Sequence, residues 1–293
     1  MNYGDQKAKE IVEAIIKALD SADSKGWKAP WTKLNMGGHR NAFSMRPYRG
    51  FNPIWLAFVA DREGYTSTYW ATFNQWKNAG LKVIKGTKTT PICFWQPSKY
   101  TKTLNDGTEE ERSGFLFKVY NLINASCVEG WEEPTTEKLE AIDTLAHCEA
   151  TIKATGANIQ HGGDRAFFAP SLDLIQLPQR DQFDSTEDYY ATAFHELVHW
   201  TGPESRLNRE FGKRFGDNAY AFEELVAELG AVMLCSEHGI EAVSRPSHAC
   251  YIKNWIETLK ADPKALWTAG SKAQQATDYI LGFAEAEEID EAA

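Results

Sequence analysis

The chain has 293 residues, enough for one large domain or two of ordinary size. Its composition, with 43% hydrophobic and 25% charged residues, is that of soluble globular proteins. No run of about 18 apolar residues occurs, so the sequence predicts no membrane span, and the N-terminus lacks the apolar core of a signal peptide.

The five cysteines are scattered, odd in number and never arranged as Cys-x-x-Cys. That usage indicates reduced thiols in a cytoplasm and argues against a disulfide framework or a cysteine-built zinc finger. We therefore expect a cytoplasmic protein that does not associate with membranes.

The net charge of −10 is divided unevenly along the chain. Residues 1–130 carry 18 Lys and Arg against 12 Asp and Glu, whereas residues 131–293 carry 13 against 29. Six of the ten tryptophans also lie in the basic half. The asymmetry predicts two domains with different partners, 1–130 and 131–293, and the composition shifts near Gly130 to Pro134.

In the first half, apolar residues at helical spacing predict an amphipathic helix over 5–20. A second helix opens with Asn52 as its expected N-cap and Pro53 at its first position. Further along, the sequence predicts a helix over 72–79, a strand and turn over 81–86, and strands over 92–95 and 115–123 joined by a polar hairpin tip.

In the second half, Ser185 is expected to cap a helix that carries Glu187 and Asp188 in its first turn and ends before Gly202. The other expected elements are a helix over 136–154, short strands within 159–177, helices over 217–237, 247–260 and 263–284, and a disordered acidic tail over 285–293. This mixture of helices and strands in two domains predicts an α+β fold class.

The helix that Ser185 caps contains the pattern His-Glu-x-x-His. Residues four apart lie on one face of a helix, so His195 and His199 can both direct an imidazole nitrogen at one metal ion. Glu196 then lies beside the metal, where its carboxylate can take a proton from a water on the ion. The pattern is typical of zinc-dependent peptide hydrolysis, and we expect zinc, or another divalent metal such as manganese, as the cofactor.

A catalytic zinc site usually has a third protein ligand. The pattern that supplies a third histidine fails here, because Ser205 stands at its position and has no imidazole. A glutamate from a following helix is another solution. In the apolar segment 222–230, Glu224 and Glu228 share one helical face at a spacing of four.

We assign Glu224 as the third metal ligand and Glu228 as the hydrogen-bond partner of a ligand histidine. The alternative third ligands are Glu228 itself or a histidine such as His238 or His248. Glu223 points about 100° away from Glu224 around the helix, so a solvated acidic face explains it.

The basic half interleaves cations with aromatic side chains. Such a surface suits single-stranded nucleic acid, because cations follow the phosphates and aromatic faces stack on bases at about 1–3 kcal/mol each. Tryptophans are also ordinary core residues, and Trp55 and Trp95, which lie in apolar runs, are expected in the core. The candidate DNA-binding residues are Lys33, Arg40, Arg46, Tyr48, Arg49, Trp70, Trp76, Lys77, Lys82, Lys85 and Lys88.

Several of these segments resemble the ArdC-type antirestriction proteins of conjugative plasmids. The resemblance covers nearly the whole chain, and its main segments are 47–52, 70–76, 83–87, 194–202, 206–209 and 220–228. It implies an N-terminal helix-plus-antiparallel-sheet domain that binds single-stranded DNA, joined to a C-terminal zincin-like metallopeptidase domain. It also implies a role in shielding incoming plasmid DNA from host restriction.

Three functions are compatible with the sequence. The first is protection by DNA binding, with a metal site that is structural or idle. The second is an active metalloprotease that cleaves DNA-bound proteins, host restriction proteins among them. The third is a metal hydrolase without a nucleic-acid function, whose aromatic residues are merely core. We favour DNA binding in protection against restriction. We leave peptidase activity open, because a His-Glu-x-x-His pattern can persist in a protein that has lost its catalytic activity.

Overall fold

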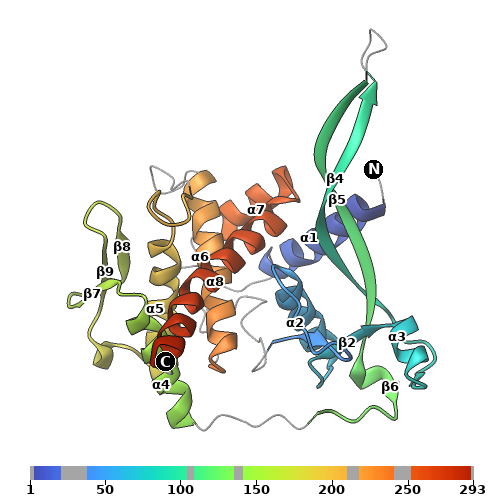
Figure 1. Cartoon of the computed structure of the whole chain (residues 1–293), viewed down its shortest axis with the longest axis horizontal. Coiled ribbons are helices and arrows are strands. Elements are labelled where there is room, and N and C mark those ends of the chain that lie inside the picture. Colours follow the sequence, from blue (N-terminus) through green and yellow to red (C-terminus); the bar gives the residue numbers. More distant parts are fainter. Residues whose placement is uncertain are drawn as a thin grey trace.

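The chain folds into an N-terminal and a C-terminal part that lie beside one another, as Figure 1 shows. The computed structural model describes residues 3–20, 38–103, 109–134, 141–209, 218–240 and 252–291. Within these ranges, no helix combines the length and the apolar character that crossing a membrane requires.

The N-terminal part contains α1 (Tyr3–Asp20), β1 (Arg40–Asn41), α2 (Asn52–Glu63), β2 (Tyr69–Thr72), α3 (Phe73–Asn78), β3 (Lys82–Val83), β4 (Thr90–Thr103), β5 (Glu109–Asn124), the 3₁₀ turn η1 (Ala125–Cys127) and β6 (Val128–Glu129). Its main sheet has the order β1-β2-β5-β4, in which β1 and β2 are parallel and the other pairs are antiparallel. The β4–β5 hairpin projects from the body of the molecule (Figure 1), and β3 pairs with β6.

The C-terminal part contains α4 (Ala141–Ala154), β7 (Asn158–His161), β8 (Phe167–Ala169), β9 (Leu174–Leu177), the 3₁₀ turn η2 (Arg180–Gln182), α5 (Thr186–Trp200), α6 (Asn218–Glu237), α7 (Ile252–Ala261) and α8 (Ala265–Glu291). Its sheet has the order β7-β9-β8, with β7 parallel and β8 antiparallel to β9. The helices α5, α6 and α8 pack together beside this sheet (Figure 1). Helices and strands in both parts confirm the α+β fold class.

Local signals place most elements where the sequence predicts them. Thr72 caps α3 in a capping box with Gln75, because the Gln75 N–H donates to Thr72 Oγ1 at 3.3 Å and the Gln75 side chain accepts from the Thr72 N–H. Ser185 caps α5 as predicted, with its Oγ accepting from the Asp188 N–H at 3.1 Å. The strands β4 and β5 are longer than predicted: residues 109–111, expected in the polar hairpin tip, already belong to β5, and the rest of that tip, 105–108, lies outside the described residues.

The start of α2 differs from the prediction by one residue. Phe51 is the N-cap, and Asn52 already belongs to the helix. The Asn52 side chain is buried and serves β4 instead: its Nδ2 donates to Cys93 O at 3.0 Å, and Cys93 N–H donates to its Oδ1 at 3.2 Å. Because β4 is an edge strand of the main sheet, Asn52 satisfies backbone groups that have no strand partner on that side.

The prediction of a disordered acidic tail is wrong for the described part of the C-terminus. The backbone of α8 stays helical through Glu291, so helix replaces the disorder expected from residue 285. The physical reason is the composition of this stretch, which is rich in alanine and glutamate, both strong helix formers.

One apolar cluster extends through both parts of the molecule. At their contact, the rings of Phe51 and Trp267 meet edge to face with their centroids 5.9 Å apart. Gly270 of α8 permits this approach, because a Cβ there would lie 2.7 Å from the Phe51 nitrogen. An ion pair between Arg49 and Asp278 lies beside the contact. The two parts therefore share a core rather than meeting across a solvated linker.

Candidate functional site

The candidate metal centre lies between α5 and α6, which an apolar interface holds together. Leu197 and Val198 of α5 and Val226 of α6 have no measurable exposure. Gly230 of α6 lets the two helices approach closely, because a Cβ there would lie 2.7 Å from a methyl carbon of Val198. This packing brings the histidines of α5 opposite the glutamates of α6.

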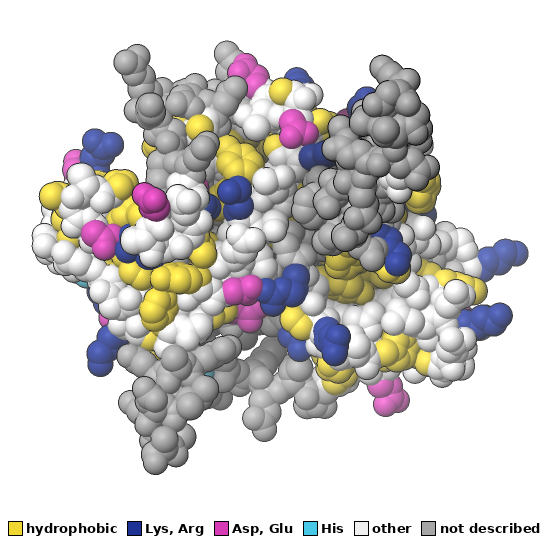
Figure 2. Space-filling view, turned by 45° about the horizontal axis from the view of Figure 1, so that its top comes forward, with side chains coloured by type: hydrophobic (Ala, Val, Ile, Leu, Met, Phe, Trp, Pro, Cys, Tyr) yellow, Lys and Arg dark blue, Asp and Glu magenta, His cyan; other side chains and the backbone are white. Residues whose placement is uncertain are grey.

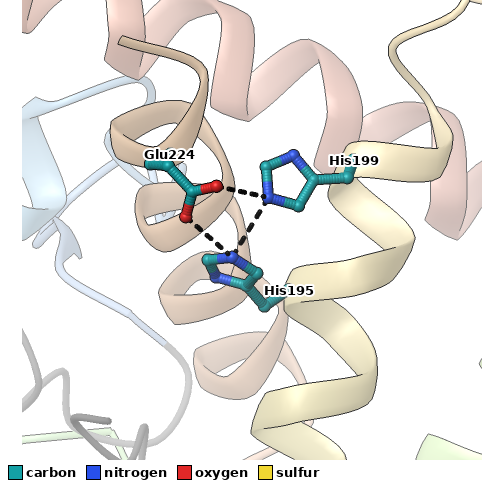
Figure 3. Close-up of side chains that lie close together, drawn as sticks. All are labelled: His195, His199 and Glu224. Atoms are coloured by element: carbon teal, nitrogen blue, oxygen red, sulfur yellow. Dashed lines mark hydrogen bonds and ion pairs between the residues drawn. The ribbon is translucent and has the colours of Figure 1, made fainter. Parts of the chain in front are cut away.

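Three potential metal ligands converge at this contact, as Figure 3 shows. The Nε2 atoms of His195 and His199 are 3.2 Å apart. Glu224 places Oε2 at 3.6 Å from Nε2 of His195 and Oε1 at 3.5 Å from Nε2 of His199. The structure therefore gathers the two histidines of the motif and the glutamate that the sequence singles out.

The spacing of these atoms fits a divalent metal ion. A tetrahedral centre with bonds of about 2.1 Å separates its ligand atoms by about 3.4 Å, close to the three distances seen here. Two imidazole nitrogens and a carboxylate oxygen are also a donor set that zinc and other divalent transition metals accept. The cluster can hold a divalent metal ion, and it is the one such group of three found among the described residues.

Glu196 belongs to the same neighbourhood. Its side chain is buried on α5, and its negative charge is one of those that raise the pKa of His199. A buried carboxylate beside the histidines fits the general base that the motif predicts, and that role stays a prediction.

Glu223 lies behind His199, on the side away from the cluster. It was expected on a solvated face, and the structure contradicts this, because Glu223 is 3% exposed. His199 Nδ1 lies 3.3 Å from Glu223 Oε1, and the buried Arg209 donates to both carboxylate oxygens, from Nε at 3.0 Å and from Nη2 at 2.8 Å. The prediction did not include Arg209, which comes from the segment before α6 and pairs with Glu223 on that face of the helix.

The charges around His199 and Glu223 shift the pKa values of both side chains. Burial lowers the pKa of His199, but the hydrogen bond to Glu223 and the negative charges of Glu224, Glu223 and Glu196 outweigh burial and raise it to about 9. Burial raises the pKa of Glu223, and the hydrogen bonds from His199 and Arg209 outweigh that effect and lower it. Both shifts favour the charged forms in the metal-free protein.

Glu228 faces the other histidine. Its Oε2 lies 3.8 Å from His195 Nδ1, an ion-pair distance that is longer than a hydrogen bond. Its expected role as a partner of a ligand histidine therefore stays a prediction. The alternative ligand His238 stacks on Phe194 with ring centroids 5.2 Å apart and is not part of the cluster, while His248 lies outside the described residues.

In the N-terminal part, the structure contradicts the stacking role predicted for Trp70 and Trp76. Both side chains are fully buried, so neither ring can receive a base. The indole N–H of Trp70 donates to His39 Nδ1 at 2.8 Å, and that of Trp76 donates to Ile123 O at 3.2 Å. Both tryptophans are core residues, like Trp55, for which the core prediction is confirmed.

The candidate cations divide into exposed and engaged groups. Arg49 pairs with Asp278 and Lys82 pairs with Glu129 at 2.9 Å, so part of their charge is already compensated. Arg40 is partly buried and, like Arg49, opposes the rise that burial causes in the pKa of Glu237. Tyr48 is also partly buried, with its hydroxyl donating to Trp70 O at 3.3 Å. The remaining described candidates, Arg46, Lys77, Lys85 and Lys88, are exposed, and Lys33 lies outside the described residues.

Other aromatic side chains of this part face the solvent. Phe43, Phe73 and Tyr120 are 40%, 54% and 39% exposed. Phe43 packs edge to face on the buried Trp76 with centroids 5.0 Å apart, which fixes its ring at the surface. Figure 2 shows Lys and Arg side chains projecting on the right of the molecule, with apolar side chains between them. The sequence prediction chose Tyr48, Trp70 and Trp76 and missed these three rings, because only the burial pattern distinguishes exposed rings from core rings.

Fold and site together define the class of this protein. Residues 146–272 match the family model of a zincin-like metallopeptidase, and residues 5–122 match that of the N-terminal domain of the anti-restriction factor ArdC. The crystal structure of the antirestriction ArdC protein from plasmid R388 in its metal-free form superposes with a TM-score of 0.77 at 31% identity, covering 95% of this chain and 98% of that one. Its Mn(II)-bound structure gives 0.75 at 31% identity, covering 94% and 97%. The chain belongs to the ArdC antirestriction family.

The sequence relatives agree with this assignment. The uncharacterized protein y4eC of Sinorhizobium fredii is 32% identical over 92% of this chain and 90% of its own length. Two DNA primases TraC of Escherichia coli are 35% and 34% identical over 93% and 94% of this chain, which spans only 20% and 27% of their lengths. The match to the N-terminal family model ends at residue 122, and the match to the metallopeptidase model begins at residue 146. A domain boundary near 130 stays a prediction.

Proposed function

We propose that this chain binds single-stranded DNA and protects incoming plasmid DNA from host restriction, with a metal centre of the metallopeptidase type in the same molecule. The observation that carries the proposal is the match to the antirestriction ArdC protein of plasmid R388 over 95% of this chain. The whole arrangement is shared, the metallopeptidase-like part included. Action in the cytoplasm fits the four described cysteines, Cys93, Cys127, Cys148 and Cys235, which are free.

The DNA surface that we propose combines the exposed cations with the exposed rings. Arg46, Lys77, Lys85 and Lys88 can neutralise phosphates; Lys77 lies on α3, Arg46 follows β1, and Lys85 and Lys88 lie in the loop between β3 and β4. Phe43 and Phe73 replace the buried tryptophans as candidates for stacking on bases. Single strands fit this surface better than duplexes, because only unpaired bases offer their faces to such rings.

At the metal centre, we propose that His195, His199 and Glu224 hold the ion. A bound divalent ion would supply a Lewis acid that polarises a carbonyl oxygen. Glu196, buried beside the histidines, would take the proton of an attacking water and give it to the leaving amine. This chemistry would act on DNA-bound proteins, host restriction proteins among them.

The DNA proposal is tested by measuring the binding of a labelled single strand at several salt concentrations. Binding should weaken with salt in proportion to the number of phosphates contacted. Replacing Phe43 and Phe73 together by alanine should cost about 1–3 kcal/mol per stacked base while leaving the salt slope unchanged. Salt-independent binding, or none, would leave the third function, a metal hydrolase without nucleic-acid contacts, as the better description.

The role of the metal centre is tested by protection assays with Glu196→Gln. The variant keeps the volume of the side chain but has no carboxylate to take a proton, so peptide hydrolysis should be lost. If it still protects incoming DNA as well as the wild type does, DNA binding is the mechanism of protection. If protection disappears while DNA binding persists, proteolysis is required.

A further inference from the structure

A buried ion pair lies directly behind the metal centre. Glu223 is 3% exposed and Arg209 is 6% exposed, so both charges lie in the interior between α5 and α6. Arg209 donates to both carboxylate oxygens of Glu223, at 2.8 and 3.0 Å, in the bidentate arrangement that is strongest for this pair. The third contact of Glu223 is Nδ1 of His199, at 3.3 Å.

The same guanidinium fixes the end of the active-site helix. Arg209 Nη2 donates to Val198 O at 2.6 Å, and Nη1 donates to Thr201 Oγ1 at 2.7 Å. These acceptors lie in the last turn of α5 and just beyond it, on either side of His199. Arg209 therefore joins the turn that carries His199 to the carboxylate that contacts the His199 ring.

We propose that Glu223 and Arg209 are a positioning pair for His199, holding its Nδ1–H so that Nε2 points at the metal position beside His195 and Glu224. An imidazole can rotate and can carry its proton on either nitrogen. A carboxylate on Nδ1–H fixes both the rotation and the tautomer, which leaves Nε2 free to bind metal. The inference rests on the proposed metal centre and adds the residues that orient one of its ligands.

A purely structural role explains the pair less well. Two charges removed from water carry a large desolvation cost, and apolar residues of similar size often replace a buried ion pair without loss of stability. Here both side chains also contact the turn that carries the ligand His199. Glu223 contacts the His199 ring, and Arg209 donates to the Val198 carbonyl. Metal affinity, rather than stability, should therefore depend on the pair.

The test removes both charges together in Arg209→Met with Glu223→Leu, so that neither is left buried alone. Zn(II) affinity is measured by competition with a chelator, and the visible absorption of the Co(II)-loaded protein reports ligand geometry. We expect Zn(II) binding to weaken by about 10–100-fold, the usual cost of losing an outer partner of a metal ligand. The Co(II) spectrum should change, while the circular dichroism spectrum and the cooperative melt of the metal-free protein persist.

Asp173→Asn is the matched control. Asp173 pairs with Arg206, which lies in the same segment after α5, and Arg206 donates to the Trp200 carbonyl oxygen at the end of that helix. Asparagine tolerates the left-handed backbone of position 173, where φ is 47°. This variant should bind Zn(II) like the wild type, and a loss as large as that of the double variant would overturn the proposal by showing that any loosening of the segment suffices.

Unchanged Zn(II) affinity and an unchanged Co(II) spectrum in a folded double variant would overturn the positioning role. If the double variant does not fold, Glu223→Gln, which keeps the side-chain volume, decides by the same two readouts. A wild-type protein that binds no Zn(II) would instead refute the proposed metal centre. The two failures are therefore distinguishable.

Discussion

Glu224 is the residue on which the proposed metal centre depends most, because its carboxylate oxygens lie within 3.6 Å of Nε2 of both histidines. Replacing it by alanine should weaken Zn(II) binding by more than about 100-fold, beyond what losing an outer partner costs. Equilibrium dialysis followed by metal analysis measures this directly. Glu228→Ala, on the same face of α6, should lose less, and retention of metal by Glu224→Ala would refute the assignment.

Two buried histidines make the stability of the protein sensitive to acid. Burial lowers the pKa of His39 to about 4, and burial with the nearby His147 does the same for His238. The unfolded chain takes up these protons near pH 6.5 and the folded chain does so only near 4, so the free energy of unfolding should fall as pH falls through this window. Each group contributes about 1.4 kcal/mol per pH unit there.

Denaturant titrations between pH 7 and 4 measure this slope. Below pH 6.5 His199 adds nothing to it, because its raised pKa makes a contribution that is constant there and is lost only as pH rises from 6.5 towards 9. His238→Phe keeps the ring that stacks on Phe194 but cannot titrate, so its slope should be shallower. An identical slope in this variant would contradict the assignment to His238.

At the level of single residues, sequence reasoning succeeded where spacing alone decides. Helical periodicity places His195 and His199 on one face of a helix and Glu224 with Glu228 on one face of another, and the structure brings His195, His199 and Glu224 together. It failed for Glu223 and for Trp70, whose environments depend on segments distant in the chain. The residues next to Glu223 in the sequence do not indicate that Arg209 will pair with it. The residues next to Trp70 do not indicate whether its ring is buried in the core or exposed for stacking.

At the level of elements, the α5–α6 crossing depends on a small residue. Gly230→Ala should destabilise the protein by about 1–3 kcal/mol, because the new methyl group would meet Val198 in a packed interface. It should also weaken metal binding, since the crossing sets the distance from Glu224 to the histidines. Thermal unfolding and a Zn(II) titration measure the two effects.

Gly282 of α8 provides the control for this change. A Cβ there would meet nothing within 4 Å, so Gly282→Ala should be neutral or stabilise the helix by about 0.5–1 kcal/mol. If both alanine variants behaved alike, helix propensity rather than the α5–α6 contact would explain the result.

The elements themselves follow closely from local sequence, and their exceptions have physical causes. Thr72 and Ser185 act as caps because capping needs only residues three positions apart. Asn52 could also cap a helix, but its side chain instead forms hydrogen bonds with the backbone of Cys93 in the edge strand β4. Strand lengths in the β4–β5 hairpin were underestimated, since pairing with a partner extends strands beyond their apolar segments.

At the scale of the whole molecule, the shared core predicts that the two parts unfold together. Differential scanning calorimetry of the metal-free chain should show one transition, because separating the parts would expose Phe51 and Trp267. Gly270→Ala should lower its midpoint, since a Cβ there meets the backbone of Phe51. Two resolved transitions in the wild type would show that the parts are independent.

The close contact between Gly270 and Phe51 also limits which proteins the metal centre could reach. With α8 lying directly on the start of α2, the surface that bears Phe43 and Arg46 is held in place relative to the helices that carry the metal centre. A strand held on that surface could present only those attached proteins that extend as far as the centre. For the proposed peptidase activity, distance along the bound strand, rather than the sequence of the attached protein, would then select what is cut.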